Sequence, residues 1–538
     1  MPRSFWGWGI DEERPSPEQA AGMAKVLEAR FGRSLGAPRP LPRPEALRLR
    51  PPRVAAPVSL RAMLSDLPIE RAGHHYGKSF RDIVRGFRGE FPAPPDYVAF
   101  PDSEADVVAL LDWCGSAGIA AIPYGGGSSV VGGVETNLPA YAGVVSLDLG
   151  KLGRVLEVDR TSRAARIQAG AYGPALEDQL RPHKLTLRHY PQSFEFSTLG
   201  GWIATRSGGH YATLYTHIDD FVESLRVVTP SGVLESRRLP GSGAGPSPDR
   251  MFIGSEGTLG VITEAWMRLQ DRPTFRAGAS VLFRGVDGFM RAAAAVRAIS
   301  QAGLYPANCR LLDAAEAQGS GAGDGTHAVL VLGFESADHA LEPWMARALE
   351  LSRAAGGEVP ASAGATRAPS GESGGGDREG AAGAWRNAFL RAPYARDALA
   401  PYAVLMETFE TAITWDRFAE FHERVMTATR DAVKRVCGAG SVSCRFTHAY
   451  PDGPAPYYSI SAPSQHGSEL AQWAEIKAAA SEALISAGGT ITHHHAVGRD
   501  HRPWYDKERP ELFSSALRAA KKALDPRGVL NPGVLIDP

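Results

Sequence analysis

Short apolar runs alternate with short amphipathic segments between residues 91 and 272. The segment 105–115 carries apolar residues at helical spacing and predicts an amphipathic helix, whose buried side would hold Val107, Val108, Leu110 and Leu111. Runs of apolar and β-branched residues predict strands at 120–122, 143–148, 165–169 and 225–232. This mixture predicts an α+β domain over 91–272.

The rest of the chain divides into three further regions. Residues 1–90 predict one helix, from Ser16 to Arg30, because Ser-Pro-Glu is a favourable helix start, and then a Pro-rich linker. A second α+β unit is predicted over 273–490, with a helix at 293–302 and a strand at 328–332. Residues 491–538 form a C-terminal segment with a basic helix at 514–523.

Two segments of low complexity interrupt the second unit, at 319–325 and 355–383. Because they consist largely of Gly, Ala and Ser, they cannot bury enough apolar surface to offset the loss of chain entropy on folding. We expect mobile surface loops, and the alternative is a lid that orders over a ligand.

The strongest chemical signal is a glycine-rich loop directly after the strand predicted at 120–122. It reads Pro123-Tyr124-Gly125-Gly126-Gly127-Ser128-Ser129-Val130. Glycine allows a positive φ and a close approach of the backbone to a ligand, and successive backbone N–H groups form a nest for an anion such as a pyrophosphate. Val130 stands where the G-x-G-x-x-G fingerprint needs its third glycine, which argues against a Rossmann NAD site.

Three further segments follow this loop in the same domain. They are Pro191-Gln192-Ser193-Phe194-Glu195-Phe196-Ser197-Thr198-Leu199-Gly200-Gly201-Trp202, Thr205-Arg206-Ser207-Gly208-Gly209 and Gly254-Ser255-Glu256-Gly257-Thr258-Leu259-Gly260-Val261-Ile262-Thr263-Glu264. In this order and at these separations, the four segments resemble the PCMH-type FAD-binding domain of the vanillyl-alcohol-oxidase superfamily. The resemblance implies an α+β fold with a two-part FAD-binding domain, an α+β cap domain for the substrate, and a C-terminal segment that returns to the flavin site.

The same resemblance implies how FAD is held. Members bind FAD in an extended pose, with main-chain amides of glycine-rich loops on the pyrophosphate. No His or Cys lies within 125–130, where covalent links to FAD are commonly made, so we expect FAD to be bound non-covalently. The cofactor-binding residues that the resemblance implies are Pro123, Tyr124, Gly125, Gly126, Gly127, Ser128, Ser129, Gln192, Ser193, Phe194, Glu195, Phe196, Ser197, Thr198, Thr205, Arg206, Ser207, Gly208, Glu256, Gly257, Thr258, Leu259, Gly260, Val261 and Ile262.

Segments beyond these four are similar to those of the alkyl-dihydroxyacetonephosphate synthases. They are His189-Tyr190-Pro191, Pro306-Ala307-Asn308-Cys309-Arg310-Leu311-Leu312-Asp313, Tyr394-Ala395-Arg396-Asp397, Glu407-Thr408-Phe409-Glu410-Thr411, Trp415-Asp416-Arg417 and His493-His494-His495-Ala496-Val497-Gly498. This resemblance implies an FAD-dependent transferase of ether-lipid biosynthesis. Such an enzyme exchanges the acyl group of acyl-dihydroxyacetone phosphate for a long-chain fatty alcohol, through an adduct at N5 of FAD and without net redox.

The resemblance implies functional roles for individual residues. Tyr457 matches the catalytic tyrosine that exchanges a proton with the leaving or entering oxygen, and Tyr458 stays open as a substitute. His189 matches the base, and Arg310 matches an arginine required for activity, although an ion pair with Asp313 would also explain it. Arg396 matches the residue that binds the substrate phosphate, for which the planar fork of arginine is well suited.

His493, His494 and His495 follow a turn that predicts a strand. On a strand, His493 and His495 would share one face and His494 would point away. Histidine titrates near neutral pH, so we expect these residues to act in acid–base catalysis or phosphate binding at the flavin site. A metal site is the alternative, but Asp500 is the only acidic residue nearby in the sequence, and we expect no metal.

Composition narrows the class of protein. The 538 residues carry 58 basic and 59 acidic side chains, so bulk charge does not favour a nucleic acid as partner. We expect a cytoplasmic protein, because we find no apolar run long enough to span a membrane and no signal peptide. The four scattered cysteines indicate buried thiols in a reducing compartment rather than disulfides.

Two other functions stay open. The first is an FAD-dependent 2-hydroxyacid dehydrogenase or oxidase for D-lactate or glycolate, which would share the flavin segments and the Asn-Pro-Gly tail but need no lipid tunnel. The second is a flavin-binding protein without catalysis. For the synthase, we expect acyl-dihydroxyacetone phosphate and a fatty alcohol as substrates, a homodimer, and peripheral contact with a membrane.

Overall fold

The computed structural model describes residues 3–359 and 392–537. The chain begins with an N-terminal arm, followed by helix α1 (Pro17–Phe31), an extended linker, and helices α2 (Pro68–Gly73) and α3 (Phe80–Phe87). Ser16 and Gln19 form a capping box before α1, and Gly32 ends the helix in the left-handed conformation. The predicted helix is therefore present, but its apolar side packs against the second α+β unit, with Ala20 and Ala24 beside Leu399.

The predicted FAD-binding domain contains two main sheets, to the first of which the N-terminal region adds one short strand. The first has the order β1 (Leu64–Ser65), β2 (Tyr97–Ala99), β4 (Gly143–Asp148), β3 (Ile119–Tyr124), in which β2, β4 and β3 run parallel and are almost wholly buried. Helix α4 (Glu104–Ala117) covers it. The second is antiparallel, with the order β5 (Val155–Asp159), β6 (Ala164–Gln168), β10 (Val261–Arg268), β8 (Val222–Thr229), β9 (Gly232–Glu235).

Helices α5 (Gly173–Leu180), α6 (Leu199–Thr205), α7 (Ala212–Tyr215), α8 (Ile218–Phe221) and α9 (Pro248–Phe252) connect the strands of this second part. A short ribbon of β7 (Leu185–Thr186) and β11 (Gln270–Asp271) joins it to the cap. The strands expected at 120–122, 143–148, 165–169 and 225–232 are all present within three residues of their predicted ends.

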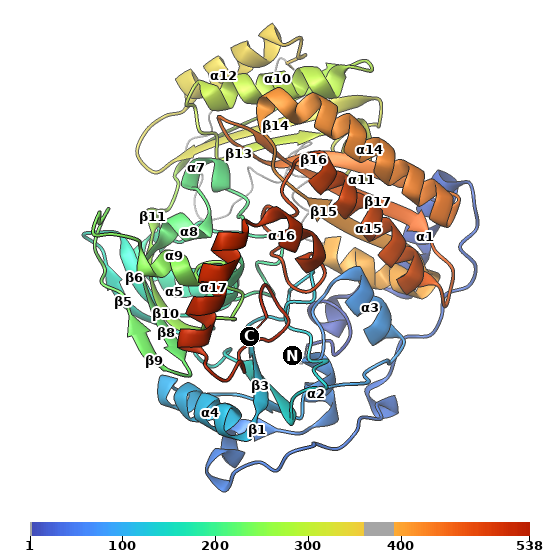
Figure 1. Cartoon of the computed structure of the whole chain (residues 1–538). Coiled ribbons are helices and arrows are strands. Elements are labelled where there is room, and N and C mark those ends of the chain that lie inside the picture. Colours follow the sequence, from blue (N-terminus) through green and yellow to red (C-terminus); the bar gives the residue numbers. More distant parts are fainter. Residues whose placement is uncertain (1–2, 360–391, 538) are drawn as a thin grey trace.

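The cap domain is one antiparallel sheet of six strands with helices on its outer face (Figure 1). The strand order is β12 (Phe275–Arg284), β14 (His327–Ser336), β13 (Asn308–Leu312), β16 (Ser441–Ala449), β17 (Pro454–Pro463), β15 (Val404–Glu410). The covering helices are α10 (Gly288–Gln301), α12 (Glu342–Ala354), α14 (Trp415–Cys437) and α15 (Glu469–Ser486). Short helix α11 (Ala314–Gly319) packs on the inner face.

The C-terminal segment returns to the FAD-binding domain, as the fold prediction requires. Helices α16 (Arg502–Glu508) and α17 (Glu511–Leu524) lead to a bridge in which Leu530 pairs in parallel with Ala121 of β3 (Figure 1). The buried Asp525 carboxylate holds this return, since it accepts hydrogen bonds from the Lys521 ammonium at 2.7 Å and from the N–H groups of Val529 and Leu530. The predicted fold is confirmed.

The structure also bears on two smaller predictions, which concern the cysteines and the low-complexity segments. All four cysteines are buried and unpaired, as the sequence predicts. The segment 319–325 lies partly at the surface, where Gly319, Gly321 and Asp324 are exposed and Ala322 is buried. Gly319 and Ser320 also line a cavity, which fits the alternative of a lid. Most of the other low-complexity segment, 360–383, lies outside the described residues. No helix in the described part of the chain is both long and apolar enough to cross a bilayer.

Replacing Lys521 by Met should destabilise the protein strongly. The substitution leaves the Asp525 carboxylate buried without its cation, which typically costs about 3–5 kcal/mol. Chemical denaturation should report this loss in the free energy of unfolding. The exposed neighbour Lys522 provides the control, because Lys522→Met should change the free energy of unfolding by less than about 0.5 kcal/mol.

Candidate active site

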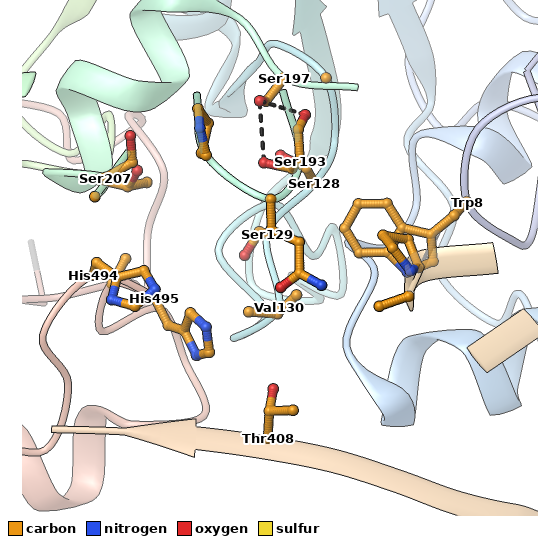
Figure 2. A pocket seen from close by; sticks show the side chains of 18 of the residues that line it. Trp8, Ser128, Ser129, Val130, Ser193, Ser197, Ser207, Thr408, His494 and His495 are labelled. Carbon is orange, nitrogen blue, oxygen red and sulfur yellow. Dashed lines mark hydrogen bonds between the residues drawn. The ribbon is translucent and has the colours of Figure 1, made fainter. Parts of the chain in front are cut away.

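A cavity of about 720 Å³ lies between the FAD-binding domain and the cap, and α1 forms part of its wall. Its walls combine the glycine-rich loop after β3, the segment 191–209, the turn before β10, the inner face of the cap sheet and the loop 494–496. Figure 2 shows Ser128, Ser129, His494 and His495 around the same space, with Thr408 on a cap strand. The cavity therefore joins segments that are far apart in the sequence.

The glycine-rich loop needs its glycines because it packs directly on the segment 196–198. A Cβ at Gly126 would lie 1.6 Å from the carbonyl oxygen of Phe196, and one at Gly125 would lie 2.2 Å from Oγ1 of Thr198. Gly127 has a φ of +66°, a conformation that costs a side chain free energy. The loop can thus present its backbone to the cavity only while these positions lack side chains, which fits a nest for the FAD pyrophosphate.

Most of the predicted cofactor residues line the cavity. Those in its wall are Pro123, Tyr124, Gly125, Gly126, Gly127, Ser128, Ser129, Gln192, Ser193, Ser197, Thr198, Thr205, Ser207, Gly208, Glu256, Gly257, Gly260, Val261 and Ile262. Those outside the wall are Phe194, Glu195, Phe196, Arg206, Thr258 and Leu259. Leu259 is part of the apolar core, and Arg206 pairs with Asp219 at 3.1 Å.

The inner face of the cap sheet forms the opposite wall. Because side chains alternate along a strand, β16 and β17 direct one set into the cavity and the other into the apolar core. The set in the cavity wall is Ser441, Ser443, Arg445, Thr447, Tyr457, Ser459 and Ser461. Val442, Cys444, Phe446 and Tyr458 belong to the core under the helices. The cap sheet thus supplies both the domain core and the polar wall of the site.

Tyr457 lies on β17 within this polar wall rather than in a surface turn. Its ring lies under the Arg445 guanidinium, 3.8 Å from the ring centre, and only 4% of the residue is exposed. Burial raises the pKa of Tyr457, although Arg445 and a hydrogen bond with Thr408 act in the opposite direction. The phenol is therefore protonated at neutral pH, the form that a general acid needs.

Tyr458 is not a substitute for Tyr457. Its ring is fully buried in the core, where it stacks on Phe409 with ring centres 4.8 Å apart, and its hydroxyl contacts His422. The structure therefore removes the alternative that the sequence left open.

The two predicted arginines both line the cavity. Arg310, on β13, is 1% exposed and donates to the carbonyl of Thr447 at 3.0 Å and to His210. Burial lowers its pKa to about 9, so it remains a cation at neutral pH. An ion pair with Asp313 does not explain it, because the Asp313 carboxylate accepts the N–H groups of Glu316 and Cys444.

Arg396 is not a surface arginine. It lies in the helical segment 392–399, lines the cavity, and donates to the carbonyl of Lys78 at 3.2 Å. Arg310 and Arg445 line the same cavity, and Arg445 forms an ion pair with Glu316, another residue of the wall. Guanidinium groups of this kind suit a phosphate group.

The three consecutive histidines do not form a strand, so the predicted alternation of their side chains is wrong. They lie in a bent loop whose backbone wraps around the carboxylate of Glu410, the last residue of β15. The N–H groups of all three histidines donate to this carboxylate. The carboxylate also lies 3.2 Å from Nδ1 of His494. Glu410 is thus the acidic neighbour that the sequence interpretation lacked, while Asp500 pairs with Arg81.

His189 is close to the cavity but does not line it. Its Nε2 makes a 2.8 Å hydrogen bond with Oγ of Ser207, a residue of the cavity wall. Burial lowers the pKa of His189 to about 3, so the imidazole is neutral at physiological pH.

Sequence reasoning missed a second group of histidines beside the loop. His448, on β16, is 2% exposed, and neither of its ring nitrogens has a hydrogen-bond partner. His217 and His493 flank it, and both bond to the hydroxyl of Tyr450. Ligand nitrogens of His448, His493 and His494 lie within 4.8 Å of one another, so the metal content of the purified protein tests the expectation of no metal.

The N-terminal region also contributes to the site, which no local motif indicated. Trp8, Met23, Val26, Leu27 and Arg30 line the cavity. The arm is held in place by the Asp397 carboxylate, which accepts the N–H of Trp8 at 2.6 Å. On the cap side, Leu399 and Met406 face the same end of the cavity and make it largely apolar.

Comparison with family models defines the class of protein. The model of the FAD binding domain matches residues 95–236, and that of the C-terminal domain of FAD linked oxidases matches residues 276–535. These matches and the loop geometry identify an FAD-dependent enzyme with a PCMH-type flavin domain.

Relatives narrow the class further. The chain is 32% identical to alkyldihydroxyacetonephosphate synthase of Dictyostelium discoideum, over 88% of this chain and 78% of that protein. It is 30% identical to the Trypanosoma brucei brucei enzyme of the same name, over 91% and 82%. A solved alkyldihydroxyacetonephosphate synthase structure matches 98% of both chains with a TM-score of 0.79 at 25% identity. The chain belongs to the alkyldihydroxyacetonephosphate synthase family.

Gly126→Ala should weaken FAD binding at least 100-fold, because the new Cβ displaces the loop from Phe196. The FAD-to-protein ratio after gel filtration, followed by titration with FAD, measures the effect. Gly22→Ala is the matched control, since a Cβ at Gly22 meets nothing within 4 Å. Normal FAD retention in the Gly126 variant would contradict the assignment of this loop.

Tyr457→Phe should reduce turnover at least 100-fold and leave bound FAD unchanged, because it removes only the phenolic hydroxyl and with it the exchangeable proton. Tyr458→Phe makes the same change one residue later on the other face of the sheet. It should cost about 1 kcal/mol of stability and little activity. Steady-state kinetics and flavin absorbance distinguish the two variants, and equal losses in both would contradict the assignment.

Proposed function

We propose that this protein exchanges the acyl group of acyl-dihydroxyacetone phosphate for a long-chain fatty alcohol, which forms the ether bond of an ether lipid. The observation that carries the proposal is one continuous cavity with three different parts. It contains the FAD-binding loops, a cationic wall with a buried phenol, and an apolar end at α1.

Arg396 and Arg310 are proposed to hold the phosphate of the substrate. Both are cations on the same cavity, and guanidinium groups can bind two phosphate oxygens at once. Tyr457, as a protonated phenol, can donate a proton to the leaving carboxylate and recover one from the entering alcohol. The His494 and His495 rings lie beside the Tyr457 ring, with centres 6.1 and 5.3 Å away, which supports the proposal that they pass that proton.

Bound FAD supplies an electrophilic ring to the exchange, and no net oxidation or reduction takes place. The chain's own residues bind the phosphate, orient the substrate carbon at which the acyl group is exchanged for the alcohol, and exclude water. Met23, Leu27, Leu399 and Met406 offer an apolar surface for the long chains. A small hydroxy acid has no long apolar chain that could bind at this apolar end of the cavity, which favours the synthase over a 2-hydroxyacid dehydrogenase.

We also propose that the protein forms a homodimer and makes peripheral contact with a membrane. Both follow from the expectation that the enzyme receives long-chain lipids at a membrane surface. Sedimentation velocity tests the homodimer, and co-sedimentation with phospholipid vesicles tests the membrane contact.

An anaerobic absorbance experiment tests the function. Palmitoyl-dihydroxyacetone phosphate should perturb the flavin spectrum, hexadecanol should restore it, and the ether product should appear by mass spectrometry. D-lactate and glycolate serve as controls and should leave the flavin oxidised. Bleaching by either hydroxy acid, without ether formation, would make the protein a dehydrogenase.

A further inference from the structure

The loop that carries the histidines has its backbone fixed by two buried carboxylates. The first is Glu410, which is 0% exposed and belongs to the cap. Its Oε2 accepts the N–H of His493 at 2.8 Å, and its Oε1 accepts the N–H of His494 at 3.1 Å and of His495 at 3.0 Å. The hydroxyl of Thr492 donates to the same carboxylate at 2.5 Å. Three successive amides of one loop therefore share a single side chain.

The second carboxylate is Glu256, which is 8% exposed and belongs to the FAD-binding domain. It accepts the N–H of Val497 at 2.9 Å and of Gly498 at 2.8 Å. Glu256 has a φ of +52° and lines the cavity beside Gly257. Burial raises the pKa of Glu256 to about 7 despite the two amides that donate to it. Burying a charged carboxylate is unfavourable unless strong donors compensate it. The five amides are those donors.

The two carboxylates come from opposite walls of the active site. Glu410 lies directly opposite Tyr457 in the register of β15 and β17. Glu256 lies in the turn that leads into β10, on the flavin side. The loop 493–498 is therefore attached to the strand pair that carries Tyr457 at one end and to the wall of the flavin pocket at the other.

We propose that Glu410 and Glu256 are positioning residues that together fix the histidine loop between Tyr457 and the flavin pocket. Neither needs to touch the substrate for this role. Each acts through the backbone of the residues that it holds. The kinetic part of this inference rests on the proposed function, and the structural part does not.

The test uses Glu410→Gln and Glu256→Gln in the FAD-loaded full chain. Glutamine has nearly the same shape, but it replaces one acceptor oxygen by an NH₂ donor that faces N–H groups. Hydrogen exchange of peptides covering 490–501 should accelerate at least tenfold at 493–495 in the first variant and at 497–498 in the second. Asp96→Asn, a buried carboxylate that accepts the N–H groups of Arg53 and Val144 far from the loop, is the matched control.

The kinetic readout separates positioning from binding. Glu410→Gln should lower kcat for acyl exchange about 100-fold with KM for the acyl substrate within about threefold of wild type, because a misplaced catalytic group affects the reacting state most. If wild-type protein shows no acyl exchange, the proposed function fails, and the hydrogen-exchange result alone decides on the positioning role.

Thr492→Val covers the case in which Glu410→Gln does not fold. This variant keeps the carboxylate but removes the hydroxyl that donates to Glu410 and accepts the N–H of His495 at 3.1 Å. Exchange should then accelerate at His495. Amide exchange at 493–498 as slow as in wild type, in the variants that fold, would overturn the proposal.

Discussion

The site depends on one constraint, which is that backbone amides buried between two domains must find acceptors. Where burial excludes water, an unpaired amide would cost free energy comparable to a lost hydrogen bond. The chain meets this constraint with buried side chains from distant positions. Glu410 and Glu256 accept the amides of the histidine loop, and Asp525 accepts those of the returning C-terminus. Asn531 donates to the carbonyls of Gly133 and Glu256, which ties that return to the flavin side.

A second constraint divides the cap sheet into two chemical faces. Strand alternation sends Tyr458 and Phe446 under the helices, and Tyr457 and Arg445 into the cavity. One residue of register shift would exchange the two sets and bury a guanidinium in the apolar core. The packing that stabilises the cap therefore also fixes the orientation of the groups that carry the chemistry.

Local motifs predict the flavin side of the site better than the substrate side. The glycine-rich loop is recognisable in the sequence because its packing leaves no room for a Cβ at Gly125 and Gly126, so both positions must be glycine. The alternation of Tyr457, Ser459 and Ser461 with apolar residues was also available as a strand signal, and it distinguishes Tyr457 from Tyr458. His448 carried no such signal, because its role depends on neighbours from other segments.

The sequence by itself determined the class of fold, the flavin-binding segments, and the residue types available for acid–base chemistry and phosphate binding. These features depend on patterns that extend over a few residues, and such patterns are visible in the sequence. Only the tertiary structure decided that three histidines surround Glu410, that Arg310 is not paired with Asp313, and that α1 forms a wall of the cavity. The physical reason is that these contacts join segments from two domains and the N-terminal region. Local propensity carries no information about which buried donor meets which acceptor across such a distance.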